Sequence, residues 1–595
     1  MQKEIKKRIY TYGIVAVLLA MVLGALCYNF GITPFSFTQN TFLKTFTSNE
    51  ELRSYLTRNS QNQGWTPYLG PLDIRVLPTI VPSAASEVEA SQSLRVYSTT
   101  NVQVAGVDEA DVVKNDGENI YLISNSNILI LKAYPPNEAT VLSKISFNSS
   151  YLAGIFISKD SNRLVVLGST YNTQESMLQG GYYPIFLDVK TFINVYDISD
   201  KAKPAFLTNF TISGSYFSSR MIGDYVYFVV SQGAYIIYDT VILPKIYSKN
   251  GIEEIGANEI YYSDASDDYY AYTTIVAINV KNTAEEPTSK TIMMAGTSSM
   301  YVSSNNIYIT FPEADGQTAI CRVHMENNAI SPEAKGDVLG REINQFSMDE
   351  FNGYFRIATT TRINGTTQNN LYVLNTNLTI VGGLEDIAPG EAIDSARFIG
   401  DRCYLATSVV RRDPFFVIDV KNATEPKILG YLKIPGFTRY LHPYDEDHVI
   451  GVGRDENNHV RISLFDVTNV SAPIAMSNYT VEGDWSDTAV LTEHKAFLFD
   501  KSKYLLVIPL TISTYDEVTY SSHTWQGVYV FNVTLSGLAL RGNVTHQDDS
   551  VSYWDSNYWI NRALYIDNVL YTISSSKIKM NDLETLALMN EIELP

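Results

Sequence analysis

One pattern recurs from residue 101 to the C-terminus and limits what this chain can fold into. In each occurrence, a strand-like run ends in a turn containing Asp, Asn or Gly, and an apolar strand follows at once. Examples are "DGENIYLIS" (116–124), "GDYVYFVV" (223–230) and "GDRCYLAT" (400–407). A third strand then often ends at Asp or Asn, as in "FFVIDV" (415–420), and a fourth leads to the next unit. Nine such units tile residues 101–595.

A four-stranded unit of this length cannot bury both faces of its own sheet, so each unit must stack on its neighbours. Antiparallel four-stranded units at such a period predict a β-propeller, whose sheets pack face to face around a channel. The 41 Tyr residues also favour strands over helices. We therefore predict an all-β protein with a single propeller at 101–595. The repeat count gives nine blades, and eight is the alternative because propellers usually have about four to eight. An array of β-sandwiches is the competing architecture.

Three units carry long insertions between their second and third strands, at 169–190, 231–274 and 511–526. In an antiparallel blade this connection emerges on the same side as the connection to the next blade. We therefore expect the insertions to crowd one face, which becomes the binding face. The second insertion contains the acidic, Tyr-rich run "YYSDASDDYYAYT" (261–273). This run is either a solvated loop packed over the propeller or a surface that contacts a partner.

The N-terminus has a basic cluster followed by an uncharged apolar run. Residues 1–8 carry four basic side chains and one acidic one, and residues 9–32 carry no charge. The run would span a bilayer of roughly 30 Å at about 1.5 Å per residue. Basic residues that flank a membrane span usually remain on its cytoplasmic side. We therefore predict a cytoplasmic tail at 1–8, a transmembrane signal anchor at 9–32 and a propeller outside the cytoplasm. A cleaved signal peptide and lipidation at Cys27 are the alternatives.

Residues 33–100 form the predicted juxtamembrane segment. A short helix is expected at 47–59, because Ser48 or Asn49 can cap it and one face is apolar. That face consists of Leu52, Tyr55 and Leu56. The stretch from about 60 to 93 is rich in Gln, Ser, Pro and Ala without periodicity, which is typical of a linker.

Charge and cysteine content narrow the choice of partners and of stabilising bonds. The formal net charge is −20, and residues 1–8 contribute +3 (four minus one), so the remainder carries −23. A body this acidic repels phosphate backbones, so we expect no nucleic-acid partner. Cys321 and Cys403 are too few for a disulfide scaffold and are predicted to be buried free thiols.

The chain also contains nine Asn-x-Ser/Thr sequons, whose number is near chance in a sequence this rich in Asn, Ser and Thr. They are compatible with a location outside the cytoplasm but do not establish it. The sequons begin at Asn148, Asn209, Asn364, Asn377, Asn422, Asn469, Asn478, Asn532 and Asn543.

Four acidic residues lie close together in "NVQVAGVDEADVVKNDGENIYLIS" (101–124), directly before the apolar run of the first unit. They are Asp108, Glu109, Asp111 and Asp116. We interpret them as turn formers and strand-end residues, with Asp116-Gly117 as a favourable hairpin dipeptide. A cation site is the alternative, but the spacing matches no calcium loop with Gly at its sixth position.

Two groups of residues are candidate ligand sites. Arg411, Arg412 and Asp413 of the sixth unit and Arg454 of the seventh should reach the insertion face, where guanidinium groups can bind a carboxylate or phosphate. Salt bridges to neighbouring acids are the alternative. His442 and His448 bracket the tight turn "PYDED" (443–447) at the opposite end of the unit-seven hairpin, and together with Asp445 they are a candidate metal site. In the alternative, the histidines are hydrogen-bonded turn residues.

At several strings the sequence resembles the family of secreted proteins with a C-terminal β-propeller distantly related to WD-40 repeats. The strings are "YSTTNVQVAGVDEADVVKNDGENIY" (97–121), "RFIGDRCYLAT" (397–407), "DPFFVIDVKNATEPKILGYLKIPGFTRYLHPYDEDHVIGVGRD" (413–455) and "HKAFLFDKSKYLLVIP" (494–509). The resemblance runs from "NEELRSYL" to the C-terminus. It implies a propeller and an extracytoplasmic location, and it carries over no catalytic residues.

Three functions are compatible with these features. The first is a membrane-anchored binding or scaffold module that presents a loop-rich face to a protein, glycan or small anionic ligand. The second is an extracytoplasmic hydrolase or oxidoreductase with its site at the channel mouth, and the third is a structural protein of the cell envelope. The chain has no HExxH, GxSxG, P-loop, CxxC or CxxCH signature, which favours binding over catalysis.

Overall fold

The computed structural model describes residues 43–61 and 95–595, apart from 149, 174–186, 238, 249–250, 265–268, 314, 409–411 and 549–554. Residues 42–595 belong to one compact unit. The predicted tail at 1–8, the predicted anchor at 9–32 and most of the predicted linker lie outside the described residues. Within the described ranges, no helix has the length and apolar character needed to cross a membrane.

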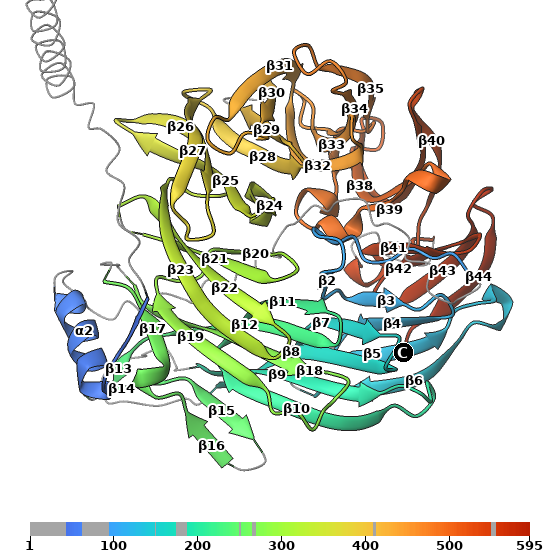
Figure 1. Cartoon of the computed structure of the whole chain (residues 1–595). Helices are drawn as coiled ribbons and strands as arrows, with labels where there is room; N and C mark the ends of the chain where they lie inside the picture. The colour runs from blue at the N-terminus through green and yellow to red at the C-terminus, as the bar shows by residue number, and fades with distance from the viewer. Residues whose placement is uncertain are drawn as a thin grey trace, which may run out of the picture. The chain divides into compact units, whose positions relative to one another are not determined.

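In the described residues, the propeller consists of nine sheets whose four core strands are antiparallel and follow one another in chain order (Figure 1). Blade 1 contains β3 (Val113–Asn115), β4 (Asn119–Ser124), β5 (Asn127–Lys132) and β6 (Thr140–Ser146). Blade 2 contains β7 (Ser150–Ser158), β8 (Arg163–Thr173), β9 (Leu187–Asp197) and β10 (Ala205–Ser213). Blade 3 contains β11 (Ser215–Ile222), β12 (Tyr225–Gly233), β18 (Ala271–Asn279) and β19 (Thr288–Met294).

In the part of the next three blades that the structure describes, each sheet has four strands and no more. Blade 4 contains β20 (Ser299–Val302), β21 (Asn306–Pro312), β22 (Gln317–Glu326) and β23 (Ala329–Leu339). Blade 5 contains β24 (Met348–Phe351), β25 (Tyr354–Ile363), β26 (Thr366–Leu374) and β27 (Ile380–Ile387). Blade 6 contains β28 (Ala392–Ile399), β29 (Arg402–Ser408), β30 (Arg412–Asp419) and β31 (Lys427–Pro435).

The last three blades complete the ring. Blade 7 contains β32 (Phe437–Asp445), β33 (His448–Arg454), β34 (Val460–Asp466) and β35 (Ile474–Thr480). Blade 8 contains β37 (Leu498–Asp500), β38 (Leu505–Asp516), β39 (Ser521–Thr534) and β40 (Gly537–Val544), and β36 (Trp485–Asp487) also pairs with β38. Blade 9 contains β41 (Arg562–Ile566), β42 (Val569–Ile573), β43 (Lys577–Asp582) and β44 (Leu588–Glu593).

Apolar packing between neighbouring blades closes the ring. The described residues form nine buried apolar clusters, and each cluster joins one blade to the next. The first blade packs on the last through Leu122 and Leu129 against Ile566 and Tyr571. The predicted all-β propeller of stacked four-stranded units is therefore confirmed, and the count of nine units agrees with the strand pairing. Cys321 and Cys403 are buried free thiols, as predicted.

A second contact repeats around the ring, in which the turn between the third and fourth strands of one blade lies on the fourth strand of the preceding blade. At three interfaces the fourth strand has a glycine where the turn of the next blade lies on it. A Cβ at this glycine would lie within 2.3 Å of a backbone carbonyl oxygen of that turn. The pairs are Gly336 with Leu378 O, Gly382 with Ala423 O and Gly430 with Val470 O. Ring closure uses the same contact, since Asn590 Nδ2 of β44 donates to Pro136 O of blade 1 at 2.6 Å.

Helix α2 (Asn49–Gln61) corresponds to the helix predicted at 47–59. Ser48 Oγ accepts a hydrogen bond from the Glu51 N–H at 3.2 Å and so caps the helix. The predicted apolar face is buried and shares a cluster with Leu243, Ile255 and Tyr262 from the insertion of blade 3. The helix therefore packs on the insertion, as Figure 1 shows at lower left.

The insertion of blade 3 extends the outer edges of two blades. β15 (Lys245–Ser248) pairs with β10 of blade 2, and β16 (Gly251–Glu254) continues that sheet. β17 (Ile260–Tyr262) pairs with β19 of blade 3, and β1 (Lys44–Thr45) pairs with β17. The insertion also contains a small hairpin, β13 (Ile236–Ile237) and β14 (Thr240–Val241).

The described part of the Tyr-rich run at 261–273 is not a solvated loop, and contact of this run with a partner stays a prediction. Tyr262, Tyr270 and Tyr272 are buried in the cluster that holds helix α2. The expectation that this insertion crowds the face above the channel is therefore wrong for its described part. The physical reason is that the backbone of the insertion pairs with the unpaired edges of β10 and β19, and that burial removes its aromatic rings from solvent.

The other two insertions do connect second to third strands, as predicted. Most of the insertion at 169–190 lies outside the described residues. The insertion at 511–526 lengthens the hairpin of β38 and β39, and the register runs without interruption from Leu505–Asn532 to Asp516–Ser521.

The glycine contacts generate a test of how blades stack. We expect Gly430→Ala to lower the free energy of unfolding by about 1–3 kcal/mol, because the new Cβ would overlap the turn of blade 7. Gly296→Ala is the matched control, since its Cβ would meet only Tyr269 carbons at 3.8 and 3.9 Å. Denaturant unfolding of both variants checks the prediction. Equal stabilities would contradict it.

Candidate functional site

The centre of the ring is occupied by a segment of the chain that precedes blade 1, residues 96–112, which we call the central segment. It starts at blade 9, where Tyr97 bridges Ile566. Asn101 Nδ2 then donates to Tyr440 Oη of blade 7 at 3.2 Å and to the carbonyl oxygen of His494 at 3.1 Å. The segment therefore contacts several blades in turn before it enters the first.

The remainder of the central segment reaches blades 5, 3 and 2. Gln103 Nε2 donates to the carbonyl oxygens of Gln345 and Met348 at 3.1 and 3.3 Å. The two-residue strand β2 (Asp108–Glu109) pairs with β11, and Asp111 bridges Ile155 of β7. Backbone hydrogen bonds thus place two carboxylates, Glu109 and Asp111, inside the ring.

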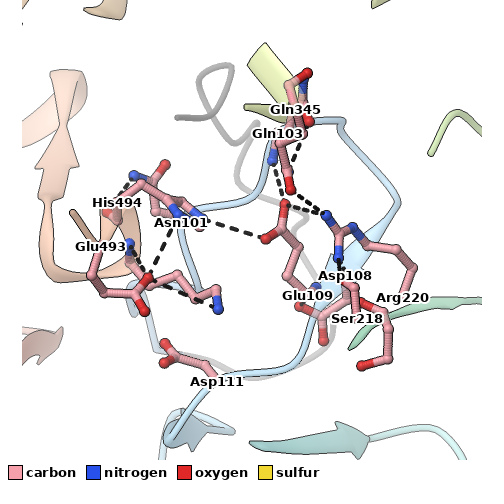
Figure 2. Close-up of polar contacts among 12 residues, drawn as sticks. Asn101, Gln103, Asp108, Glu109, Asp111, Ser218, Arg220, Gln345, Glu493 and His494 are labelled. Atoms are coloured by element: carbon pink, nitrogen blue, oxygen red, sulfur yellow. Dashed lines mark hydrogen bonds and ion pairs between the residues drawn. The ribbon is translucent and has the colours of Figure 1, made fainter. Parts of the chain in front are cut away.

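Glu109 is buried, with 2% of its surface exposed, and basic or polar groups from three directions face it (Figure 2). Its Oε1 accepts from the Gln103 N–H at 3.1 Å and lies 3.7 Å from Nη2 of Arg220 in β11. Its Oε2 lies 3.4 Å from Nε2 of His494. Arg220 is itself fixed, because Nη2 donates to Gln345 Oε1 at 3.0 Å.

Asp111 forms the second half of the central network. Arg562 of β41 approaches Asp111 Oδ1 with Nε and Nη2, each at 3.0 Å, and its Nη2 also lies 3.4 Å from Glu493 Oε2. Burial by itself would lower the pKa of Arg562, but Asp111 and Glu493 outweigh it and raise that pKa. Lys495 Nζ lies 3.9 Å from Glu493 Oε1. Three carboxylates thus face three bases: Glu109, Asp111 and Glu493 against Arg220, Arg562 and Lys495.

His494, in the short helix His494–Ala496, lies between the two halves of the network. Its Nε2 is 3.4 Å from Glu109 and its Nδ1 is 3.6 Å from Glu493 Oε1. Burial, reinforced by nearby Lys495 and Arg397, lowers the pKa of His494 well below 6.5, so the ring is neutral at neutral pH. Because no part of its surface is exposed, His494 cannot touch a solute directly. The network therefore holds the central segment in place.

The interpretation of the four acids in 101–124 as turn formers and strand-end residues is correct for Asp116, in a turn, and for Asp108 and Glu109, which form the two-residue strand β2. Asp116 Oδ1 accepts from the N–H groups of Glu118 and Asn119 at 3.0 and 2.7 Å. Glu109 and Asp111 also pair with the buried Arg220 and Arg562, which the sequence pattern did not predict. Their position in the sequence could have indicated these pairs. Arg220 and Arg562 each lie in the apolar first strand of a unit, where a buried charge needs a partner of opposite charge.

The predicted arginine site is only partly described. Arg411 lies outside the described residues, and Arg412 and Asp413 belong to β30, where only their backbone is described. Arg454 pairs with Asp487 and donates to the carbonyl oxygen of Ser486 at 2.7 Å. It therefore ties blade 7 to blade 8, and a convergence of these arginines on an anion stays a prediction.

The histidines of the predicted metal site have separate partners. His448 Nδ1 lies 2.7 Å from Asp445 Oδ1, as expected for a hydrogen-bonded turn residue. His442 is buried, with Nδ1 3.0 Å from Tyr440 Oη and its ring against Phe497. Across the described ranges, no group of three or more His, Cys, Asp or Glu side chains is arranged to hold a metal.

Among the described residues, the two most exposed large apolar side chains, Val518 and Tyr520, lie at the tip of the hairpin between β38 and β39, which we call the blade 8 tip (residues 515–520). Val518 is 87% exposed, Tyr520 81% and Tyr515 50%. The tip is ordered by Asp516, whose Oδ1 accepts from the N–H groups of Val518 and Thr519 at 2.8 and 3.3 Å. Apolar groups are thus held in solvent on a well-paired hairpin.

These observations define the class of protein: a closed β-propeller with a filled centre and exposed apolar groups on one hairpin. Residues 97–586 match the family described as "Beta propeller domain", and the chain belongs to that family. An uncharacterized protein of Methanocaldococcus jannaschii is 28% identical over 86% of this chain and 85% of its own length. An uncharacterized protein of Archaeoglobus fulgidus is 27% identical over 93% of this chain and 94% of its own length.

Solved structures are similar to the chain at low sequence identity. A protein from Lactobacillus plantarum is 13% identical with a TM-score of 0.33, covering 56% of this chain and 95% of its own. The dihydro-heme d1 dehydrogenase NirN is 10% identical with a TM-score of 0.33, covering 76% of this chain and 78% of its own. At these scores the likeness carries no functional argument.

The central network predicts a large cost for removing one charge. Glu109→Gln keeps the shape of the side chain but leaves Arg220 buried without its carboxylate, so we expect a loss of about 3–5 kcal/mol in unfolding free energy. Glu584→Gln, at an exposed turn position, should cost less than about 0.5 kcal/mol. Denaturant unfolding measures both, and a small cost for Glu109→Gln would show that the buried pair is dispensable.

Buried histidines predict acid sensitivity. His546 is buried between Ser574 Oγ and Thr572 Oγ1, at 3.0 and 2.9 Å, and burial lowers its pKa to about 3 from 6.5. Below pH 6.5 the imidazole of His546 is protonated in the unfolded chain but stays neutral in the folded chain. The free energy of unfolding therefore falls with decreasing pH. His546 should account for a loss of about 2 kcal/mol between pH 7 and pH 5. Unfolding at both values should show a correspondingly smaller loss in His546→Gln.

Proposed function

We propose that this protein is a membrane-tethered propeller, located outside the cytoplasm, that binds a protein partner through the blade 8 tip. The β-propeller fold supports a binding or scaffold module. The observation that carries the proposal is the exposure of Val518 and Tyr520, at 87% and 81%, on an ordered hairpin. Clustered exposed apolar groups are typical of interaction sites.

The chemistry of the tip favours a protein over a glycan or an anion. Tyr515, Tyr520 and nearby Trp485 combine an apolar body with a polar atom, as is common in protein interfaces. Val518 at the apex offers only apolar contact, whereas a glycan platform depends on aromatic faces. Asp516 and Glu517 add negative charge, which disfavours an anionic ligand. Because the hairpin is already ordered, little conformational entropy is lost on binding.

The membrane tether and the outside location rest on the sequence of residues 1–32. A basic octapeptide before an uncharged run predicts an anchor with the body outside. The central charges favour binding over catalysis, because the buried acids and bases are engaged with one another. An enzyme would need such groups exposed to a substrate.

Capture of the full chain from its native membrane tests the binding proposal. We expect the double substitution Val518→Asp and Tyr520→Ser to weaken retention of a specific protein by about tenfold or more, as loss of a hot spot does. Ile363→Asp is the matched control, because Ile363 is 38% exposed at the end of another second-strand hairpin, in blade 5. Equal retention by both variants, or retention of a glycan instead of a protein, would contradict the proposal.

A further inference from the structure

Four blades share one turn between their third and fourth strands. In each, the strand ends in an Asp or Asn whose Oδ1 accepts the N–H two residues later, at 2.8 to 3.1 Å. The residue three positions after that Asp or Asn forms a second hydrogen bond of the turn. Its backbone carbonyl oxygen accepts the N–H of the residue three positions further along the chain, at 2.9 to 3.1 Å. The residues at this second position are Asp200, Asn282, Asn422 and Asn469 in blades 2, 3, 6 and 7. The four turns are therefore structurally equivalent.

Blades 6 and 7 carry a hydroxyl that blades 2 and 3 lack. Thr424 and Ser471 stand two residues after Asn422 and Asn469, which makes both asparagines part of Asn-x-Ser/Thr sequons. Thr424 Oγ1 donates to Asn422 Oδ1 at 3.0 Å, and Ser471 Oγ donates to Asn469 Oδ1 at 2.8 Å. Blades 2 and 3 have Ala202 and Ala284 at this place.

The amide nitrogens of these two asparagines are available. Both side chains are exposed, and no hydrogen bond in the described part of the chain uses Nδ2 of Asn422 or Asn469. The inner side of each turn is the side that packs, since Ala423 O faces Gly382 and Val470 O faces Gly430 of the preceding blade. A group attached to Nδ2 would extend into solvent and leave the contact between blades intact.

We propose that Asn422 and Asn469 are N-glycosylation sites, an inference that rests on the proposed location outside the cytoplasm. In the transfer, Nδ2 forms a bond to the anomeric carbon of a lipid-linked glycosyl phosphate. The bond between that carbon and the phosphate oxygen breaks, and the phosphate leaves with the electron pair. The amide proton passes to a base of the cell's transferase.

Blade 3 supplies an internal control. Asn282 is an exposed asparagine in the same turn, but Ala284 provides no hydroxyl. Ala284→Thr should therefore create a modified site at Asn282. Thr424→Ala should abolish modification of Asn422 while keeping the asparagine, and Thr424→Ser should retain it.

Peptide mass spectrometry of the full chain, made in cells that N-glycosylate outside their membrane, tests the inference. We expect a glycan mass on the peptides containing Asn422 and Asn469, none on Asn282, and the gain and loss described for the variants. Protease added to intact cells reports the location separately. If the added protease digests the propeller and Asn422 and Asn469 are unmodified, the proposed glycosylation is wrong, whereas the proposed location outside the cytoplasm stands. Protection of the propeller would overturn the proposed location and the sites together.

Discussion

The apolar contact between the first and last blades is the constraint on which the rest of the structure depends. No four-stranded blade can bury both of its faces alone, so an open row would leave one face of each end blade in water. Packing Leu129 of blade 1 against Ile566 and Tyr571 of blade 9 removes both exposed faces at once. Ring closure therefore stabilises every other interface, because it fixes the angle at which all blades stack.

Closure also creates the space that the central segment fills. Charges are costly in the interior of a protein unless they are paired, and here Glu109 and Asp111 are paired with Arg220 and Arg562 from blades far apart in the sequence. The central segment thus connects the last blade to the first through the middle of the ring. The proposed binding surface therefore lies on the outside, at the blade 8 tip with its exposed apolar groups.

The repeat pattern predicted most of the fold because its signals are local. A turn rich in Asp, Asn or Gly followed by an apolar strand depends on residues a few positions apart, and helix α2 likewise depended on Ser48 as a cap and on a single apolar face. The candidate site was less predictable. His448 forms the hydrogen-bonded turn that was the alternative to a metal ligand, whereas His442 packs against Phe497 from the next blade.

The amino-acid sequence by itself determined the strands, their grouping in fours and the need for each group to stack on another. These follow from alternating burial and turn chemistry within about 50 residues of chain. The tertiary structure alone decided which charges meet in the centre and where the insertion of blade 3 pairs. Both depend on contacts between different sheets rather than on a local pattern. Asp111 meets Arg562 across 451 residues of sequence because the ring closes, and the insertion pairs with the outer strands β10 and β19 of two neighbouring blades.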